Sequence, residues 1–378
     1  MRWNSRKFLG DCDMPINVDK GVVRRLQLLA SLAFPRLASQ GAVNMILQAT
    51  SRLARQEGPA NGDLEALAAA VDELSRARLL FKTYEGHHKV GIFGSARSQE
   101  GSEEYELARQ VGTAIRRAGW MVITGAGPGL MQAVNEGAGV GHSFGLNIRL
   151  RSSPRPNAFI SEDKHVPFTD FWARKHAFIR EADSFIFFAG GFGTADEVFE
   201  VLTLMQMGKT PLRPIVLLGP PTDDYWPRWM TFLRDVLVAR GYVKEANVRL
   251  MTLATSSESV VAEIEKFYSN YLGMCWVGGR LRLHVRVAPQ PHRLSQLTES
   301  FRDIILSGDI ACIQQKAGAC GSAEIAFLFD GKSYGRLRIL IDELNRDAPD
   351  GETGDGRSVS AEGEWHAAED RGPSDPPN

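Results

Sequence analysis

The chain has 378 residues and a formal net charge of −1. This length suffices for a sizeable core and for two domains, and the near-neutral charge argues against nucleic acid or a membrane surface as a partner. The four cysteines form no CxxC pair, which argues against zinc or a disulfide framework and favours a reducing compartment. Without a signal-like N-terminus or an apolar run that could span a bilayer, we expect a cytoplasmic globular protein.

Residues 1–86 are predicted to form a helical N-terminal arm. Apolar residues recur there at helical spacing and predict one stripe, made of Leu64, Leu67, Ala68, Val71, Leu74 and Leu80. The arm carries no constellation of catalytic residues. We interpret it as a packing arm or dimerisation element, with the stripe buried on the helices of the next domain or across a dimer.

Residues 87–270 alternate short apolar runs with helical segments. The expected strands are Val90–Phe93, Trp120–Thr124, Phe144–Leu150, Ser184–Phe188 and Ile215–Leu218, and the expected helices are 103–118, 129–138, 170–182, 194–208, 226–240 and 257–268. This alternation is typical of an α/β fold with a Rossmann-like, doubly wound, mostly parallel sheet. Such sheets bind ligands beyond the carboxyl ends of their strands.

Three glycine turns follow expected strands, at Gly94–Arg97, Gly125–Gly129 and Gly190–Thr194. A single ligand that contacts all three is the simplest explanation. The third turn lies between an apolar strand and an apolar helix. Its glycines let backbone N–H groups approach an anion, and Thr194 is positioned to cap the helix that follows.

Glu197 comes three residues after Thr194. That is the spacing of a helix-capping glutamate, and equally that of a carboxylate placed to stabilise positive charge on a phosphorylated sugar. Glu200 lies on a neighbouring position of the same helix and either shares this work or is a surface charge. The adjacent Arg174 and Lys175 begin the preceding helix and either bind phosphate or a developing anion, or form a surface basic pair.

Other motifs carry less weight. Gly208-Lys209-Thr210 resembles the end of a P-loop, but Thr203 replaces the required glycine and the segment ends a helix. None of the glycine turns has the G-x-G-x-x-G spacing, which weakens a dinucleotide-binding interpretation. Lys164, Lys175 and Lys209 are candidate pyridoxal lysines, and no sequence context singles one out.

Residues 275–345 are predicted to form a small α+β appendage. A strand over Leu281–Val287 alternates apolar residues with a row of basic ones, which either binds an anion or is a solvated face. A helix over 293–306, a strand over Ile325–Phe329 and a helix over Leu337–Leu344 follow. Residues 346–378 are rich in Gly, Pro, Ser, Asp and Glu and predict a disordered tail.

The turns and charged residues of the central region resemble the LOG (Lonely Guy) phosphoribohydrolases. The shared segments, in family order, are Gly125–Met131, Arg174-Lys175 and Gly190–Glu197. The resemblance implies a Rossmann-like enzyme, usually dimeric, that hydrolyses the N-glycosidic bond of adenine-type nucleoside 5′-monophosphates. The products are the free base, N6-prenylated in cytokinin producers, and ribose 5-phosphate. No metal or organic cofactor is needed.

By position, the resemblance makes Arg174 and Glu197 the catalytic residues. The substrate-binding residues that we expect are Ser95, Gly127, Gly129, Met131, Lys175, Gly190, Gly191, Gly193 and Thr194. Two residues depart from the family pattern: Ala189 replaces the proline of PGGxGTxxE, and Ala126 replaces the second glycine of the first motif. The partners implied are a nucleotide substrate and a second copy of the chain in a homodimer or higher homo-oligomer. The alternatives are a non-catalytic nucleotide-binding carrier or regulator, and a pyridoxal-dependent decarboxylase.

Overall fold

The structure is a computed structural model that describes residues 45–51, 53, 62–150, 155–315 and 322–347. The chain divides into two units, Met1–Asp72 and Glu73–Asn378. The predicted tail from residue 348 on, and most of the predicted N-terminal arm, lie outside the described residues. No helix in the described ranges is long and apolar enough to cross a membrane.

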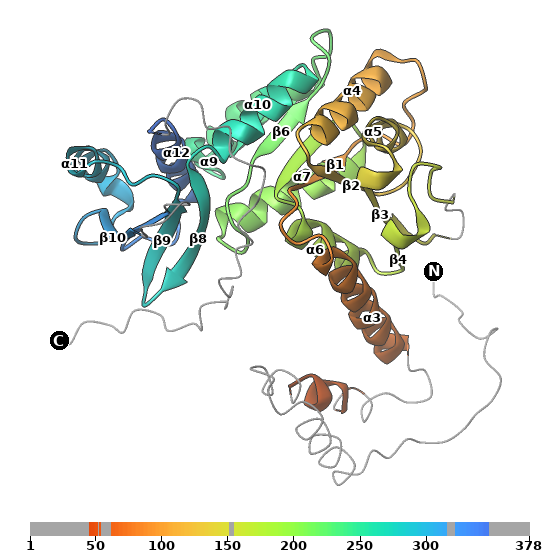
Figure 1. Ribbon diagram of the computed structural model, residues 1–378, viewed down its shortest axis with the longest axis horizontal. Helices are drawn as coiled ribbons and strands as arrows, with labels where there is room; N and C mark the ends of the chain where they lie inside the picture. Colours follow the sequence, from red (N-terminus) through yellow and green to blue (C-terminus); the bar gives the residue numbers. More distant parts are fainter. Residues whose placement is uncertain (1–44, 52, 54–61, 151–154, 316–321, 348–378) are drawn as a thin grey trace. The chain divides into compact units, whose positions relative to one another are not determined.

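A seven-stranded, all-parallel sheet forms the centre of the second unit (Figure 1). Its strand order is β4-β3-β2-β1-β5-β6-β7. The strands are β1 (Lys89–Phe93), β2 (Met121–Thr124), β3 (Ser143–Ile148), β4 (His165–Phe168), β5 (Ser184–Phe188), β6 (Ile215–Leu218) and β7 (Met251–Ala254). The α/β doubly wound class expected from the sequence is confirmed.

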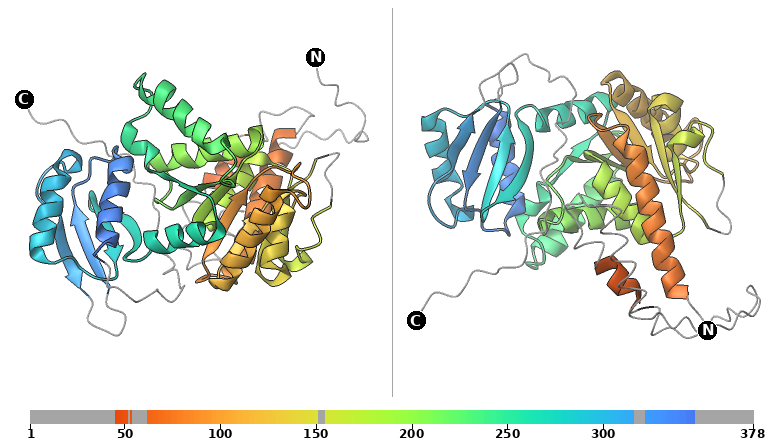
Figure 2. Two further views of the ribbon diagram at one scale, coloured as in Figure 1. Left: turned by 90° about the horizontal axis from the view of Figure 1, so that it is seen from above. Right: turned by 60° about the horizontal axis from the view of Figure 1, so that its bottom comes forward.

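Every residue of the central strands β1, β5 and β6 is buried because helices cover the sheet on both faces (Figure 2). The helices between and after the strands are α4 (Glu103–Arg117), α5 (Leu130–Ala138), α6 (Phe171–Glu181), α7 (Phe192–Gln206), α8 (Tyr225–Phe232), α9 (Glu245–Val248) and α10 (Ser257–Phe267). One core cluster packs α4, α5 and α10 against β1, β2, β5 and β6.

The strand order reverses beside β1. Strands β2, β3 and β4 continue to one side of β1, whereas β5, β6 and β7 continue to the other. In parallel α/β sheets the crevice at such a reversal, outside the carboxyl ends of the strands, is where ligands bind. The three glycine turns follow β2, β1 and β5, which are neighbours in the sheet, so the topology brings all three to this crevice.

The C-terminal residues form a second, four-stranded antiparallel sheet of order β10-β11-β9-β8. Its strands are β8 (Tyr271–Val277), β9 (Arg280–Val285), β10 (Ala311–Gln315) and β11 (Ala323–Phe327), accompanied by α11 (Pro291–Ser300) and α12 (Tyr334–Asn345). The α+β nature of the appendage was expected, but β8 and β10 were not. On the basic face of β9, Arg282 and His284 lie within ion-pair distance of Glu324, which favours a neutralised surface over an anion site.

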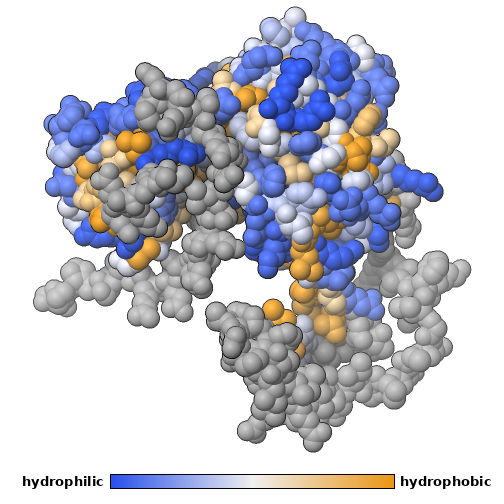
Figure 3. Space-filling model, in the orientation of Figure 1, coloured by the Kyte–Doolittle hydropathy of each residue, from blue (hydrophilic) through white to orange (hydrophobic). Residues whose placement is uncertain are grey.

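Helix α3 (Gly62–Lys82) ends the first unit and begins the second. The face that it buries differs from the predicted stripe: the buried residues are Ala70, Glu73, Ala77 and Phe81. Leu67, Val71 and Leu79 are exposed, and Figure 3 shows hydrophobic residues gathered along this helix. Burial within the single chain is therefore wrong for Leu67 and Val71 of the predicted stripe, and burial across a dimer stays a prediction.

Candidate active site

Backbone hydrogen bonds tie the three glycine turns into one surface. The N–H of Ser95 donates to the carbonyl of Ala189 at 3.2 Å, which joins the turn after β1 to the turn after β5. The N–H of Leu130 donates to the carbonyl of Ser95 at 3.0 Å, which joins the turn after β2 to the turn after β1. Ser95 therefore lies between the other two turns, as a ligand contacting all three would require.

The three glycine positions in the turn after β2 leave no room for a side chain. A Cβ on Gly125 would lie 2.6 Å from Arg174 Nη2, and one on Gly127 would lie 2.7 Å from Met131 Cε. Gly129 has a φ of +69° and would meet the backbone carbonyl of Ser95 at 2.5 Å. These glycines let the turn pack directly against Arg174 and Met131.

Ala126, the departure from the family's glycine, has a φ of 57° and is fully buried. Polar side chains hold this turn: Thr124 Oγ1 accepts from Ala126 N at 3.0 Å and donates to Asn135 Oδ1 at 2.8 Å. Asn157 Nδ2 donates to the carbonyl of Gly127 at 3.1 Å, and Asn157 N donates to the carbonyl of Ala126 at 2.9 Å. The network keeps an alanine in a left-handed conformation that would otherwise cost about 1–2 kcal/mol.

Helix α7 begins earlier than the sequence predicts. Its N-cap is Gly191, whose carbonyl accepts from the N–H groups of Thr194 and Ala195, both at 3.1 Å. The predicted capping role of Thr194 is wrong, because Gly191, three residues before the expected start, serves as the N-cap. Thr194 instead packs on Gly190, where a Cβ would lie 2.2 Å from its hydroxyl oxygen.

The first turn of α7 faces solvent. Gly191, Phe192 and Gly193 are all exposed, and Phe192 is 97% exposed. The first N–H groups of a helix have no partner within the helix, so this end offers free donors and the positive end of the helix dipole. The hydroxyl of Tyr225 donates to the carbonyl of Gly190 at 2.8 Å and fixes the strand side of the turn.

Glu197 lies on the second turn of α7, which rules out the helix-capping alternative. Its side chain is buried at 5% exposure, and its Oε2 has no hydrogen-bond partner among the described residues. Burial raises the pKa of this carboxyl to about 7, although Arg174 and Lys175 oppose the shift. A carboxyl with this pKa and a vacant oxygen can stabilise a cation or exchange a proton near neutral pH.

Arg174 reaches the same point from α6. Its Nε donates to the carbonyl of Leu146 at 2.7 Å, and its guanidinium lies 5.0 Å from the ring centre of Phe178. Its Nη1 lies 4.0 Å from Glu197 Oε1. Burial lowers the pKa of Arg174, and Glu197 opposes this effect. The two predicted catalytic residues are thus neighbours.

Lys175 is close by but engaged. Its Nζ lies 2.7 Å from Asp196 Oδ2 and 2.6 Å from Glu200 Oε2, so it joins α6 to α7. These carboxylates raise the pKa of the ammonium despite its partial burial. Glu200 is therefore a partner of Lys175, which sets it apart from the buried Glu197. These contacts give Lys175 a bracing role between the two helices, and its predicted contact with substrate stays a prediction.

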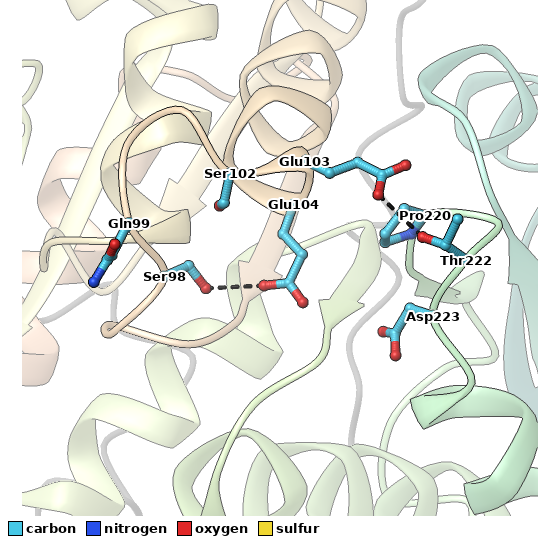
Figure 4. Close-up of a pocket in the computed structure, with 8 residues that line it drawn as sticks. All are labelled: Ser98, Gln99, Ser102, Glu103, Glu104, Pro220, Thr222 and Asp223. Atoms are coloured by element: carbon cyan, nitrogen blue, oxygen red, sulfur yellow. Dashed lines mark hydrogen bonds between the residues drawn. The ribbon is translucent and has the colours of Figure 1, made fainter.

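A cavity of about 490 Å³ adjoins these turns between the start of α4 and the loop after β6 (Figure 4). Its lining residues are Ser98, Gln99, Ser102, Glu103, Glu104, Pro220, Thr222 and Asp223. Ser98 donates to Glu104 at 3.1 Å and Thr222 donates to Glu103 at 3.0 Å. None of the predicted site residues lines this cavity, and its three carboxylates are unsuited to a phosphate.

Three side chains that support the site were missed by the sequence analysis: Tyr225, Asn157 and Glu73. Glu73 accepts hydrogen bonds from Thr169, just before α6. Each partner lies 30 or more residues away in the chain. No local motif marks such residues, because their role arises only when distant segments meet.

Comparisons with known proteins agree with the predicted resemblance. The model of a family described as "Possible lysine decarboxylase" matches residues 131–264. The Pyrimidine/purine nucleotide 5′-monophosphate nucleosidase of Escherichia coli (strain K12) is 33% identical over 136 residues, covering 32% of this chain and 30% of that protein. The Cytokinin riboside 5′-monophosphate phosphoribohydrolase LOG7 of Arabidopsis thaliana is 29% identical over 183 residues, covering 47% of this chain and 82% of that protein.

Among solved structures, the molybdenum cofactor carrier protein of Chlamydomonas reinhardtii is 20% identical, with a TM-score of 0.33, over 47% of this chain and 97% of that one. The chain spans about a third of the length of the Escherichia coli relative. Together with the family match, the curated relatives confirm the similarity to the LOG phosphoribohydrolases that the three motifs predicted.

Proposed function

We propose that this protein hydrolyses the N-glycosidic bond of purine nucleoside 5′-monophosphates to a free base and ribose 5-phosphate. One observation carries the proposal: a buried carboxyl, Glu197, has a pKa of about 7 and a vacant oxygen, and Arg174 lies 4.0 Å away. This pair lies where three glycine turns meet at the reversal of the sheet. The names of the relatives support the same reaction.

The reaction needs a group that stabilises positive charge on the sugar. When the bond between C1′ and the base nitrogen breaks, its electron pair leaves with the base and the sugar becomes oxocarbenium-like. Ionised Glu197 stabilises this cation and orients the attacking water. Water oxygen then bonds to C1′, one water proton remains on the new hydroxyl, and the other ends on the departing base. Arg174 orients the nucleotide and offsets negative charge on the phosphate or the base.

The phosphate is assigned to the exposed N-terminus of α7. Gly190, Gly191 and Gly193 present backbone N–H groups there, and no side chain lies within 4 Å of a Cβ position at Gly191 or Gly193. Thr194 completes the turn, with its own N–H bonded to the carbonyl of Gly191. Binding energy from the phosphate, which does not itself react, then holds C1′ against Glu197. Ser95, Gly127, Gly129 and Met131 line the adjoining turns and complete the proposed nucleotide site.

The geometry weakens the two alternatives. A pyridoxal Schiff base needs a lysine that readily loses its proton, whereas Lys175 is held charged by two carboxylates. A carrier without turnover has no need of a buried carboxyl with a raised pKa, because that group costs stability.

We further propose that the base is of the adenine type, N6-prenylated in a cytokinin pathway. We also propose that the protein acts in the cytoplasm as a homodimer or higher homo-oligomer. Exposed aromatic side chains beside the site support the oligomer: Phe171, Trp172 and Phe192 are 53%, 60% and 97% exposed. Sedimentation of the purified protein tests this part.

Product analysis tests the proposed reaction. Purified protein is incubated with a panel of nucleoside 5′-monophosphates, and both products are quantified by chromatography. We expect free base and ribose 5-phosphate in equal amounts from at least one purine nucleotide. Release of inorganic phosphate with the nucleoside, or no cleavage of any nucleotide, contradicts the proposal.

A further inference from the structure

Helix α3 lies beside α6 (Figure 1), and one contact between them is at the start of α6, the end that carries Arg174. The contact is made by Glu73, the first residue of the second unit, whose side chain is 3% exposed. Its Oε1 accepts from Thr169 N at 2.8 Å and from Thr169 Oγ1 at 2.6 Å, and its Oε2 accepts from Asp170 N at 3.4 Å. A carboxylate at this depth is retained only when its oxygens are so occupied.

The segment that Glu73 holds is the start of α6. Asp170 is the N-cap: its side chain accepts from Ala173 N at 2.8 Å, and its carbonyl accepts from Arg174 N at 3.2 Å. Arg174 is thus one helical turn from the residues that Glu73 binds. The same carboxylate places negative charge at the positive end of the α6 dipole, which stabilises the helix start.

We propose that Glu73 is a positioning residue for Arg174. Through Thr169 and Asp170 it fixes the first turn of α6, and hence the guanidinium that faces Glu197. This inference rests on the proposed function, because it assigns an effect on turnover. It places part of the active-site support in α3, which the sequence predicts to be part of a packing arm or dimerisation element.

The structure offers a matched control on the same two helices. Arg78 of α3 lies 3.7 Å from Glu181, at the other end of α6. Replacing Arg78 with alanine loosens α3 against α6 without touching the start that carries Arg174. If Glu73 served general packing alone, Glu73→Ala and Arg78→Ala would differ in stability but not in turnover.

The test compares Glu73→Ala, Glu73→Gln and Arg78→Ala with the full wild-type chain. Displacing a catalytic group by about 1 Å costs up to about 10²-fold in rate, so we expect Glu73→Ala to lower kcat by about 10-fold to 10²-fold. KM should change little, because the phosphate turn on α7 is untouched. Glu73→Gln keeps an oxygen for both Thr169 donors and should restore most of kcat, and Arg78→Ala should retain wild-type kcat.

A pH profile of kcat separates displacement of Arg174 from a general loosening of α3 against α6, because such loosening does not shift the profile. The charged groups that face Glu197 are Arg174 and Lys175 from α6, and Asp196 and Glu200 from α7; the two cations lower its pKa. If Arg174 moves away in Glu73→Ala, the acidic limb of the profile should shift to higher pH relative to the wild type on the same substrate. An unshifted limb together with wild-type kcat overturns the inference, as does a glutamine variant as slow as the alanine variant.

Hydrogen exchange separates the inference from the proposed function. The amides of Thr169 and Asp170 should exchange faster in Glu73→Ala than in the wild type or Arg78→Ala, whatever the enzyme acts on. If these amides exchange faster in Glu73→Ala but the wild type cleaves no nucleotide, the proposed function is wrong and the positioning role of Glu73 is supported. If exchange at these amides is unchanged in Glu73→Ala, the positioning role of Glu73 is wrong. Should Glu73→Ala fail to fold, Thr169→Val, which removes one donor only, replaces it in both measurements.

Discussion

Glu197 Oε1 lies 4.0 Å from Arg174 Nη1, too far for a hydrogen bond, while both side chains are nearly buried. Two opposite charges removed from water normally close to hydrogen-bond distance and satisfy their remaining donors and acceptors. Here Glu197 Oε2 is left without a partner in the described structure. The unused oxygen of Glu197 therefore leaves an acceptor available to a group that lies beside the pair.

The first prediction concerns turnover. Glu197→Gln keeps the shape of the side chain and removes its charge, so nucleotide affinity should persist while kcat falls. Losing one electrostatic group of this kind typically costs on the order of 10²–10³ in rate. The matched control is Glu200→Gln on the same helix, which loosens Lys175 only and should retain most activity. Steady-state kinetics with both variants checks this, and near-wild-type turnover in Glu197→Gln would remove Glu197 from the mechanism.

The second prediction concerns the pH dependence of activity. Burial raises the pKa of Glu197 to about 7, and the proposed role needs the ionised form. The rate should therefore rise with pH through about 7 and level off above it. The measurement is a kcat profile on one nucleotide from mildly acidic to mildly alkaline pH. A kcat that stays constant down to pH 5 would show that ionised Glu197 is not required.

The third prediction concerns stability. The pKa of Glu197 is raised from 4.5 in the unfolded chain to about 7 in the fold, so the fold prefers the protonated form. Stability from this group is full below pH 4.5, falls as the pH rises and is lost above about 7. The shift corresponds to at most ~3 kcal/mol. Glu197→Gln should thus be more stable than wild type at pH 8, with the difference shrinking toward pH 5.

Denaturant unfolding at the two pH values measures this difference. If Glu197→Gln is more stable than the wild type and has a lower kcat, the difference in stability is the cost of burying a charged catalytic group. A variant less stable than the wild type at pH 8 would contradict the assigned direction of the pKa shift.

The fourth prediction concerns the ends of the chain. Asp347 lies within 3.2 Å of Arg293, so the informative cut lies just after Asp347. Removing residues 348–378 should leave stability and activity nearly unchanged, because this segment has too little apolar content to form a core. Removing residues 1–86 should cause aggregation or a change in oligomer size, because it takes away Glu73 and Phe81 and exposes the surface that they cover.

Light scattering on both truncations checks this prediction. Aggregation of the chain lacking residues 348–378, together with an unchanged mass of the chain lacking residues 1–86, would reverse the roles given to the two ends.

Local patterns predicted most of the central sheet because β1, β2, β5 and β6 are short, largely apolar runs that end within two residues of a glycine. They missed β4 and β7, which are only partly buried and interrupt their apolar residues with His165 and Pro167 in β4 and with Thr252 in β7. They also placed the start of α7 two residues late, because Gly191 caps the helix with its backbone and leaves no side-chain signal. The adjacency of the three turns was predictable because carboxyl ends of neighbouring parallel strands share one edge.

The contacts between distant segments were not predictable. Helix α3 was expected to bury its large apolar residues, yet it buries small alanines, Glu73 and Phe81. The ring centre of Phe81 lies 4.8 Å from that of Phe144 of β3, and Glu73 binds Thr169. Which face of a helix is buried depends on the partner surface, and a single sequence does not contain that information.

The most direct test of the central claim compares one nucleotide with its own nucleoside. The wild-type protein is incubated with AMP and, separately, with adenosine, and the initial rate of adenine release is measured for each. Because the N-terminus of α7 is assigned to the 5′-phosphate, AMP should be cleaved far faster, by on the order of 10² or more. Equal rates on the two compounds, or no adenine from AMP while another purine 5′-monophosphate is also inert, would contradict the account.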